Sequence, residues 1–272
     1  MPTSPSPRSA LSSLRRFLIL ALALVAFAAV PANPVRGATS AADAETRLLG
    51  WINAARVERG LVPLVRWSNL ASVAGRRAAW MAETNTMSHS GAGNLVTQMA
   101  SEGVTWYGYG ETIGYVGGSL SADAATSLFR GWRSSPPHWD LLMSGRFNYV
   151  GIGLAHRPAG DRTFGSVVLT ESVDHSGARA WLRSASRAGD DLRWSWSGAD
   201  RRLQTHMAGL RDFDVQYRVD GGAWRTLRND TTATSLTLRD RAKGHMYSLR
   251  VRATDRRGTV GAWTNTSRIW VP

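Results

Sequence analysis

The chain has 272 residues, which suggests one or two domains, and its formal net charge is +13 because 33 lysine and arginine residues outnumber 20 aspartate and glutamate residues. It contains no cysteine, which excludes disulfides and leaves stability to apolar cores. Basic residues are interspersed with acidic ones, which argues against nucleic acid as a partner. The excess charge favours an anionic cell-wall polymer, polysaccharide or lipid surface, although a solvated arginine-rich surface would have the same composition.

Residues 1–32 have the organisation of a secretory signal peptide. Three arginines precede an unbroken apolar run of 14 residues, Phe17–Val30. A basic segment before about 7–15 apolar residues is typical of such a peptide, whereas a permanent membrane span needs about 20. Cleavage could fall as late as residue 41. We therefore predict an exported protein, secreted or associated with the cell wall, without a permanent membrane span.

Helical and strand patterns alternate over residues 41–177, the first predicted domain. Apolar residues at helical spacing predict helices over 44–61, 68–85, 93–103, 121–135 and 136–144. Two β-branched runs, 148–157 and 162–173, flank a turn and predict a hairpin. The stretch 104–118, rich in Trp, Tyr and Gly, is expected to be a loop that lines a ligand cleft or is simply packed. The pattern predicts an α+β domain in which helices cover a small antiparallel sheet.

Strand patterns alone appear in the second predicted domain, residues 189–272, after a linker predicted at 178–188. The strands are expected within 192–198, 212–227, 233–240 and 246–258. Asp220-Gly221-Gly222 is a strong hairpin signal. More than eighty residues of this kind predict an all-β sandwich.

The first domain resembles the CAP superfamily of cysteine-rich secretory, antigen 5 and pathogenesis-related proteins, in its cysteine-free bacterial branch. The resemblance rests on four pieces in the family's order, LLGWINAARVERGLVPLVRWSNLASVAGRRAAWMA, MSHS, GYGETIGYV and GWRSSPPHWDLLMSGRFNYVGIGLA, followed by the hairpin. It covers about 130 residues. It implies a CAP-type α-β-α sandwich.

The second domain resembles a fibronectin type III module, an immunoglobulin-like sandwich. The resemblance places six residues at core positions: Trp194, Tyr217, Trp224, Leu238, Tyr247 and Trp263. Tyr247 matches the position of the tyrosine corner in such modules.

The resemblance also implies a cleft with two histidines in the first domain. His89 of MSHS matches the family's first histidine, Glu111 its first acid and His138 its second histidine. Two imidazoles can bind zinc or another divalent metal, while a carboxylate binds it directly or orients a histidine. Ser135 stands at the family's second acid, and Thr112 stands where the family has asparagine. A site with two histidines and one carboxylate is expected to hold metal weakly.

His138 also carries a signal of its own, because it follows Pro136-Pro137 at the predicted start of a helix. Ser134 or Ser135 can cap that helix. One ring nitrogen of His138 is then free for a proton, a metal or a ligand. The plainer alternatives are a capped histidine packed beside its neighbour, a helix-end role for His89, and a loop carboxylate that binds backbone N–H groups for Glu111. Ser135 and His138 also stand three residues apart, but no nucleophile elbow accompanies them, and no catalytic residue is assigned.

The predicted function is non-enzymatic binding at the cell envelope or in the extracellular space. A cleft of His89, Glu111, Ser135 and His138 would bind a divalent metal or a lipid-like ligand, the lipid being implied by the family alone. The second domain would serve as a spacer or bind an anionic wall polymer. The alternative is a metal-dependent hydrolase acting on wall polymers, peptides or nucleic acid, and a third reading is a structural protein with a vestigial site.

Overall fold

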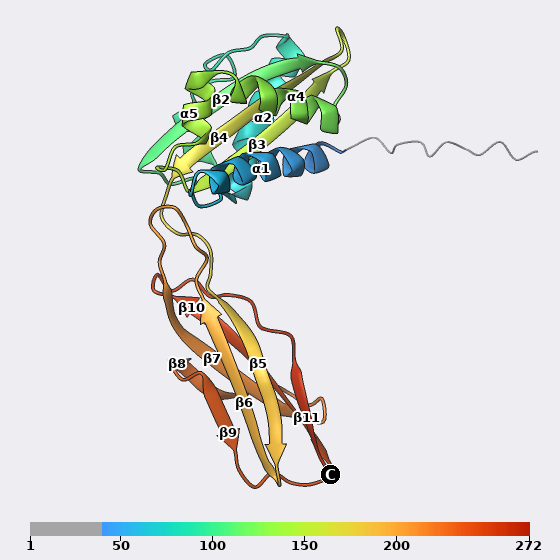
Figure 1. Ribbon diagram of the computed structural model, residues 1–272, viewed down its shortest axis with the longest axis vertical. Helices are drawn as coiled ribbons and strands as arrows, with labels where there is room; N and C mark the ends of the chain where they lie inside the picture. Colours follow the sequence, from blue (N-terminus) through green and yellow to red (C-terminus); the bar gives the residue numbers. More distant parts are fainter. Residues whose placement is uncertain (1–39) are drawn as a thin grey trace, which may run out of the picture. The chain divides into compact units, whose positions relative to one another are not determined.

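The computed structural model describes residues 40–272, so the predicted signal peptide and its cleavage site lie outside the described residues. The described chain begins with helix α1 (Ala41–Glu58), which Figure 1 shows in blue. The Ser40 hydroxyl caps this helix by accepting the N–H of Asp43 at 3.1 Å. No helix within residues 40–272 is long and apolar enough to cross a membrane.

The first domain is built on a four-stranded sheet with strand order β1-β3-β4-β2. The strands are β1 (Val65–Arg66), β2 (Gly108–Gly117), β3 (Tyr149–Arg157) and β4 (Arg162–Glu171). Strand β1 runs parallel to β3, whereas the other pairs are antiparallel. The predicted hairpin is confirmed as β3 and β4. The loop predicted over 104–118 is wrong, because most of this stretch is strand β2, which pairs with β4 along its whole length.

Helices cover both faces of this sheet, which confirms the α-β-α sandwich (Figure 1). The remaining helices are α2 (Ser68–Thr84), α3 (Leu95–Ser101), α4 (Ala122–Arg133) and α5 (Pro136–Leu142). Val150, Ile152 and Leu154 of β3 pack in one apolar cluster with α1, α4 and α5. Tyr149 belongs to the cluster of α2 and α3 on the opposite face. The alternation along β3 therefore separates the two layers.

Two glycines of β3 let α2 lie directly on the sheet. A Cβ at Gly151 would lie 2.1 Å from the backbone carbonyl carbon and oxygen of Leu70, and one at Gly153 would lie 2.4 Å from those of Ala74. The contact is thus backbone to backbone. It fixes the distance between α2 and β3, and hence the place of the side chains that α2 turns toward β2.

A buried arginine ties α1 to the chain that follows α5. The Arg56 guanidinium donates hydrogen bonds to the carbonyl oxygens of Val62, Leu142, Ser144 and Phe147. Burial lowers the pKa of Arg56 to about 10, so the side chain remains charged at neutral pH. Its charge is met by carbonyl dipoles, which a lysine could not engage with the same fork of donors.

The second domain is a sandwich of two antiparallel sheets. One sheet has the order β5-β6-β9, with β5 (Arg179–Ala188), β6 (Asp191–Ala199) and β9 (Ser235–Leu238). The other has the order β11-β10-β7-β8, with β7 (Leu210–Val219), β8 (Arg225–Thr231), β10 (His245–Asp255) and β11 (Ser267–Val271). The predicted all-β immunoglobulin-like sandwich is confirmed.

The linker predicted at 178–188 is wrong, because strand β5 occupies it and pairs with β6. Most side chains of β5 are exposed, so the strand lacks the apolar alternation by which strands are found in a sequence. The boundary between the domains therefore lies near Ala178 instead of residue 189.

The core of the second domain keeps part of the predicted set. Trp194 is fully buried, and the hydroxyl of Tyr247 donates to the carbonyl of Ala242 at 3.3 Å, as in a tyrosine corner. Leu238 packs against the core while partly buried, and Tyr217 is half-buried. The core positions predicted for Trp224 and Trp263 are wrong. Both rings are half-buried and stack on arginine instead, with the guanidinium of Arg250 lying 4.2 Å from the ring of Trp224 and 4.5 Å from that of Trp263.

Candidate functional site

Glu111 is the buried centre of the first candidate site. It lies on β2 opposite Val168 of β4, and its side chain is 4% exposed. Its Oε2 atom lies 2.8 Å from Nδ1 of His89, a residue that follows α2 and is 59% exposed at the side chain. The structure therefore brings His89 and Glu111 together, and it places Glu111 on a strand.

Arg77 of α2 is the main partner of Glu111, and sequence reasoning misses it. The side chain of Arg77 is 1% exposed, and its guanidinium meets both carboxylate oxygens, with Nε bonded to Oε1 and an Nη2–Oε2 distance of 3.0 Å. The same guanidinium donates to the backbone carbonyl of His89. One feature of the sequence points to Arg77: it lies beside Ala74 and Ala78 on the buried face of α2. A charged residue at a buried position needs a partner of opposite charge.

The carboxylate of Glu111 is saturated with donors. Oε1 accepts from Arg77 and from the hydroxyl of Ser166 at 3.0 Å, while Oε2 accepts from Arg77 and His89. A carboxylate offers about four acceptor sites, so none remains for a metal or a transferred proton. Glu111 instead holds the ring of His89 by Nδ1, which leaves Nε2 as the outward nitrogen.

His138 pairs with Ser135 at the start of α5. The two prolines, Pro136 and Pro137, occupy the first helical positions as predicted. Ser135 is the N-cap residue, as predicted, but neither its hydroxyl nor that of Ser134 accepts a backbone N–H of the helix. Prolines remove the first backbone N–H groups that a cap would bind. The hydroxyl of Ser135 lies instead 2.8 Å from Nδ1 of His138.

The residues of the predicted cleft thus form two hydrogen-bonded pairs, one at Glu111 and one at His138. The pairs meet β2 from different sides. Leu141 of α5 has its Cδ1 atom 2.6 Å from the place of a Cβ on Gly110. Neighbouring residues of a strand point to opposite faces, so α5 packs on the face opposite the carboxylate of Glu111. A cleft shared by His89, Glu111 and His138 stays a prediction.

Each of the two imidazoles keeps one ring nitrogen that could bind a metal. The Nε2 atoms of His89 and His138 have no hydrogen-bond partner among residues 40–272. Neutral imidazole nitrogen is a preferred zinc ligand. Glu111 would orient His89 without touching the metal, because its oxygens are occupied.

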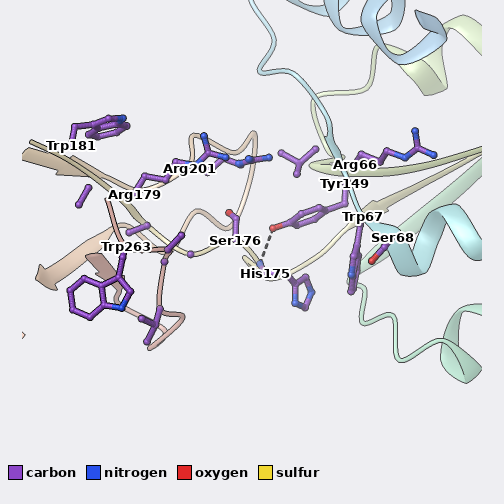
Figure 2. Close-up of a pocket in the computed structure, with 17 residues that line it drawn as sticks. Arg66, Trp67, Ser68, Tyr149, His175, Ser176, Arg179, Trp181, Arg201 and Trp263 are labelled. Carbon is purple, nitrogen blue, oxygen red and sulfur yellow. Dashed lines mark hydrogen bonds between the residues drawn. The ribbon is translucent and has the colours of Figure 1, made fainter. Parts of the chain in front are cut away.

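A second candidate site is a pocket of about 750 Å³ lined by aromatic and basic residues (Figure 2). Trp67 and Tyr149 come from the first domain, while Trp181 and Trp263 come from the second. The ring of His175 stacks on that of Trp67 with a centroid distance of 4.1 Å. The contacts of Trp263 with Arg250, described above, hold its ring in place. The pocket therefore has a pre-formed aromatic wall.

The charges that line this pocket all have one sign. Arg66, Arg179 and Arg201 line it, and none of its lining residues is acidic. Arg66 is paired with Glu45 at 2.5 Å, whereas the guanidinium groups of Arg179 and Arg201 have no ion-pair partner within the described part of the chain. Sequence reasoning misses this site, because its walls come from segments far apart in the chain, and only their shared aromatic and basic character is visible beforehand.

The comparison with protein families agrees with the fold. Residues 49–170 match the model of CAP, the cysteine-rich secretory protein family. The first domain is therefore a CAP domain, which confirms the resemblance found in the sequence. No curated protein matches the chain.

Several solved structures are similar to parts of the chain. An extracellular protein containing an SCP domain from Bacillus anthracis shares 20% identity over 47% of this chain and 40% of its own, with a TM-score of 0.41. An outer surface protein of Borrelia burgdorferi shares 16% identity over 48% of this chain and 95% of its own, with a TM-score of 0.43. A fibronectin type III-like protein from Clostridium thermocellum shares 20% identity over 37% and 96%, with a TM-score of 0.24. The chain thus spans 40% of the length of the Bacillus protein.

Proposed function

We propose that this protein is an exported, non-enzymatic binding protein whose ligand is an anionic polysaccharide or wall polymer. The pocket of Trp67, Trp181 and Trp263 with Arg179 and Arg201 is the observation that carries the proposal. The arginine-led apolar run at the N-terminus and the secretory CAP family support export.

The chemistry of the pocket suits sugar rings that bear acidic groups. Flat indole rings cover the apolar faces of sugars, and guanidinium groups bind carboxylates or phosphates through paired, charge-assisted hydrogen bonds. Among residues 40–272, Arg179 and Arg201 form no ion pair, so a ligand would not displace one there. A purely apolar lipid would leave these guanidinium groups buried without a partner, which is costly.

A binding assay with two polysaccharides tests the proposal. The mature protein should bind polygalacturonate but not uncharged dextran of similar length, and about 1 M salt should release it. Arg179→Ala should weaken binding about tenfold, since it removes a charge-assisted contact. Arg187→Ala removes the same charge from the same strand outside the pocket and should change the dissociation constant less than about twofold.

A matched pair of tryptophans separates stacking from charge. Trp181 is 45% exposed and lines the pocket, whereas Trp270 is 50% exposed and lies outside it. Trp181→Ala should weaken binding, and Trp270→Ala should not. Equal losses in the pocket variants and their controls would show attraction by net charge alone and would overturn the proposed site.

The free imidazole nitrogens support a second binding activity, for zinc or another divalent metal. We expect saturable zinc binding at one site in calorimetry, abolished in both His89→Ala and His138→Ala. Loss in both variants would mean that the two histidines share one cleft. Absence of binding by the folded wild type would leave Glu111 and Ser135 as purely structural partners of the two rings.

A further inference from the structure

Three aspartates converge where the two domains join. Asp174 follows β4, Asp200 follows β6 and Asp255 ends β10. Each offers a carboxylate oxygen, and these atoms all lie within 4.8 Å of one another. Residues Ala38–Pro272, which include all three segments, form one compact unit. Asp174 is 2% exposed, Asp255 is fully buried, and Asp200 is half-buried.

One carboxylate oxygen of this cluster has no partner. Oδ1 of Asp255 accepts the backbone N–H groups of Arg257 and Thr259, both at 2.8 Å. Oδ2 of Asp255 is buried and accepts no hydrogen bond from any residue of the described chain. Burying an anionic oxygen without a hydrogen-bond donor costs free energy. Such an atom therefore indicates a binding site for a cation or another ligand.

Within the described part of the chain, no ion pair balances the charge of the three carboxylates. The charge of Asp255 acts on Arg211, but the guanidinium of Arg211 is paired with Asp212 at 2.6 Å. Asp174 and Asp200 otherwise accept hydrogen bonds from backbone N–H groups and from hydroxyls, which carry no net charge. The carboxylates of Asp174, Asp200 and Asp255 can therefore bring up to three negative charges into one largely buried cluster.

Burial and hydrogen bonds act in opposite directions on two carboxylates of the cluster. Burial raises the pKa of Asp200, and the charge of Asp174 raises it further. Burial also acts to raise the pKa of Asp174, but hydrogen bonds from Ser176 and Ala208 outweigh it and lower that pKa.

We propose that Asp174, Asp200 and Asp255 bind a calcium ion that joins the two domains. An all-oxygen set of carboxylates suits a hard cation, and the absence of histidine and cysteine disfavours zinc. Calcium tolerates irregular geometry and completes its shell with carbonyls and water, whereas magnesium demands a near-ideal octahedron. The unpaired Oδ2 of Asp255 supplies a ligand without breaking an existing hydrogen bond.

The ion would also order the polysaccharide pocket. Ser176 and Arg201 line that pocket and lie within two residues of Asp174 and Asp200. Calcium would fix their backbone and so tighten ligand binding by linkage. The calcium site itself does not depend on the proposed polysaccharide, because it can be tested with the metal alone.

The test is calcium titration of chelator-treated mature protein by calorimetry and by thermal unfolding. We expect one saturable site, with Tm raised by roughly 5 °C at a hundredfold excess over Kd. Asp200→Asn should weaken calcium binding at least tenfold. Asp240→Asn makes the same change at an exposed residue outside the cluster and should bind calcium as the wild type does.

Asp255→Asn supplies an independent check on the buried ligand, since it keeps Oδ1 for the N–H groups of Arg257 and Thr259. It should lose the calcium-dependent rise in Tm. A wild type that is folded and shows neither heat of binding nor a rise in Tm would overturn the proposal. Equal calcium binding by Asp200→Asn would overturn it as well, by placing the ion elsewhere. Zinc binding that survives in Asp200→Asn would belong to the histidines.

Discussion

Alanine at Gly151 should cost more than about 4 kcal/mol of unfolding free energy, a loss seen only when a core is badly disrupted. The new Cβ would overlap the backbone carbonyl of Leu70 at 2.1 Å, where no side chain can rotate away. Ordinary overpacking costs about 1–3 kcal/mol because side chains yield. Here α2 itself would have to move off β3, and its contacts with the sheet would go with it. Urea unfolding followed by circular dichroism measures the loss.

Gly50→Ala is the matched control for this substitution. Gly50 is exposed on α1, and nothing lies within 4 Å of its would-be Cβ. Alanine there should raise stability by about 0.5–1 kcal/mol, because it restrains the unfolded chain and favours the helix. A Gly151→Ala protein as stable as the wild type would mean that α2 does not rest on the backbone of β3.

The sequence VGIGL shows how much of the fold is predictable. The alternation of Val150, Ile152 and Leu154 predicts a strand with one apolar face. Gly151 and Gly153 leave the other face of this strand without side chains. A strand with one bare face needs a close neighbour, and a helix supplies it. Local patterns of this kind predict the helices and the β3–β4 hairpin correctly. They fail for β5, whose edge position leaves its polar side chains in water and removes the alternation.

The candidate sites are less predictable because their partners are distant in sequence. Nothing near Arg77 reveals that its partner, Glu111, comes 34 residues later on another element. The same holds for Asp174, Asp200 and Asp255, which only the strand topology assembles. The positions of Trp224 and Trp263 are mispredicted for another reason. A large apolar side chain such as tryptophan predicts a core position, yet both residues are half-buried. Here arginine side chains cover the rings on the outer face of the sheet.

Glu111→Gln should destabilise the protein by about 3–5 kcal/mol, because it leaves the charge of Arg77 buried without a counterion. The side chains of Arg77 and Glu111 are 1% and 4% exposed, so water cannot solvate the guanidinium in place of the lost carboxylate. The matched control is the ion pair made by the preceding residue of α2. Arg76 pairs with Glu102 at 46% and 28% exposure, and Glu102→Gln should cost at most about 1 kcal/mol. Chemical unfolding of both variants gives the comparison.

A double-mutant cycle distinguishes the ion pair from simple loss of packing. Arg77→Met leaves Glu111 without its main donor and should be as harmful as Glu111→Gln. The double variant removes both charges, so its cost should fall short of the sum by about 2 kcal/mol. Additive losses would contradict a coupled pair. Arg77 also donates to the backbone carbonyl of His89, so Arg77→Met should loosen that segment and weaken zinc binding at an imidazole to which Arg77 makes no hydrogen bond. The buried pair then acts on the site by holding the backbone that presents His89.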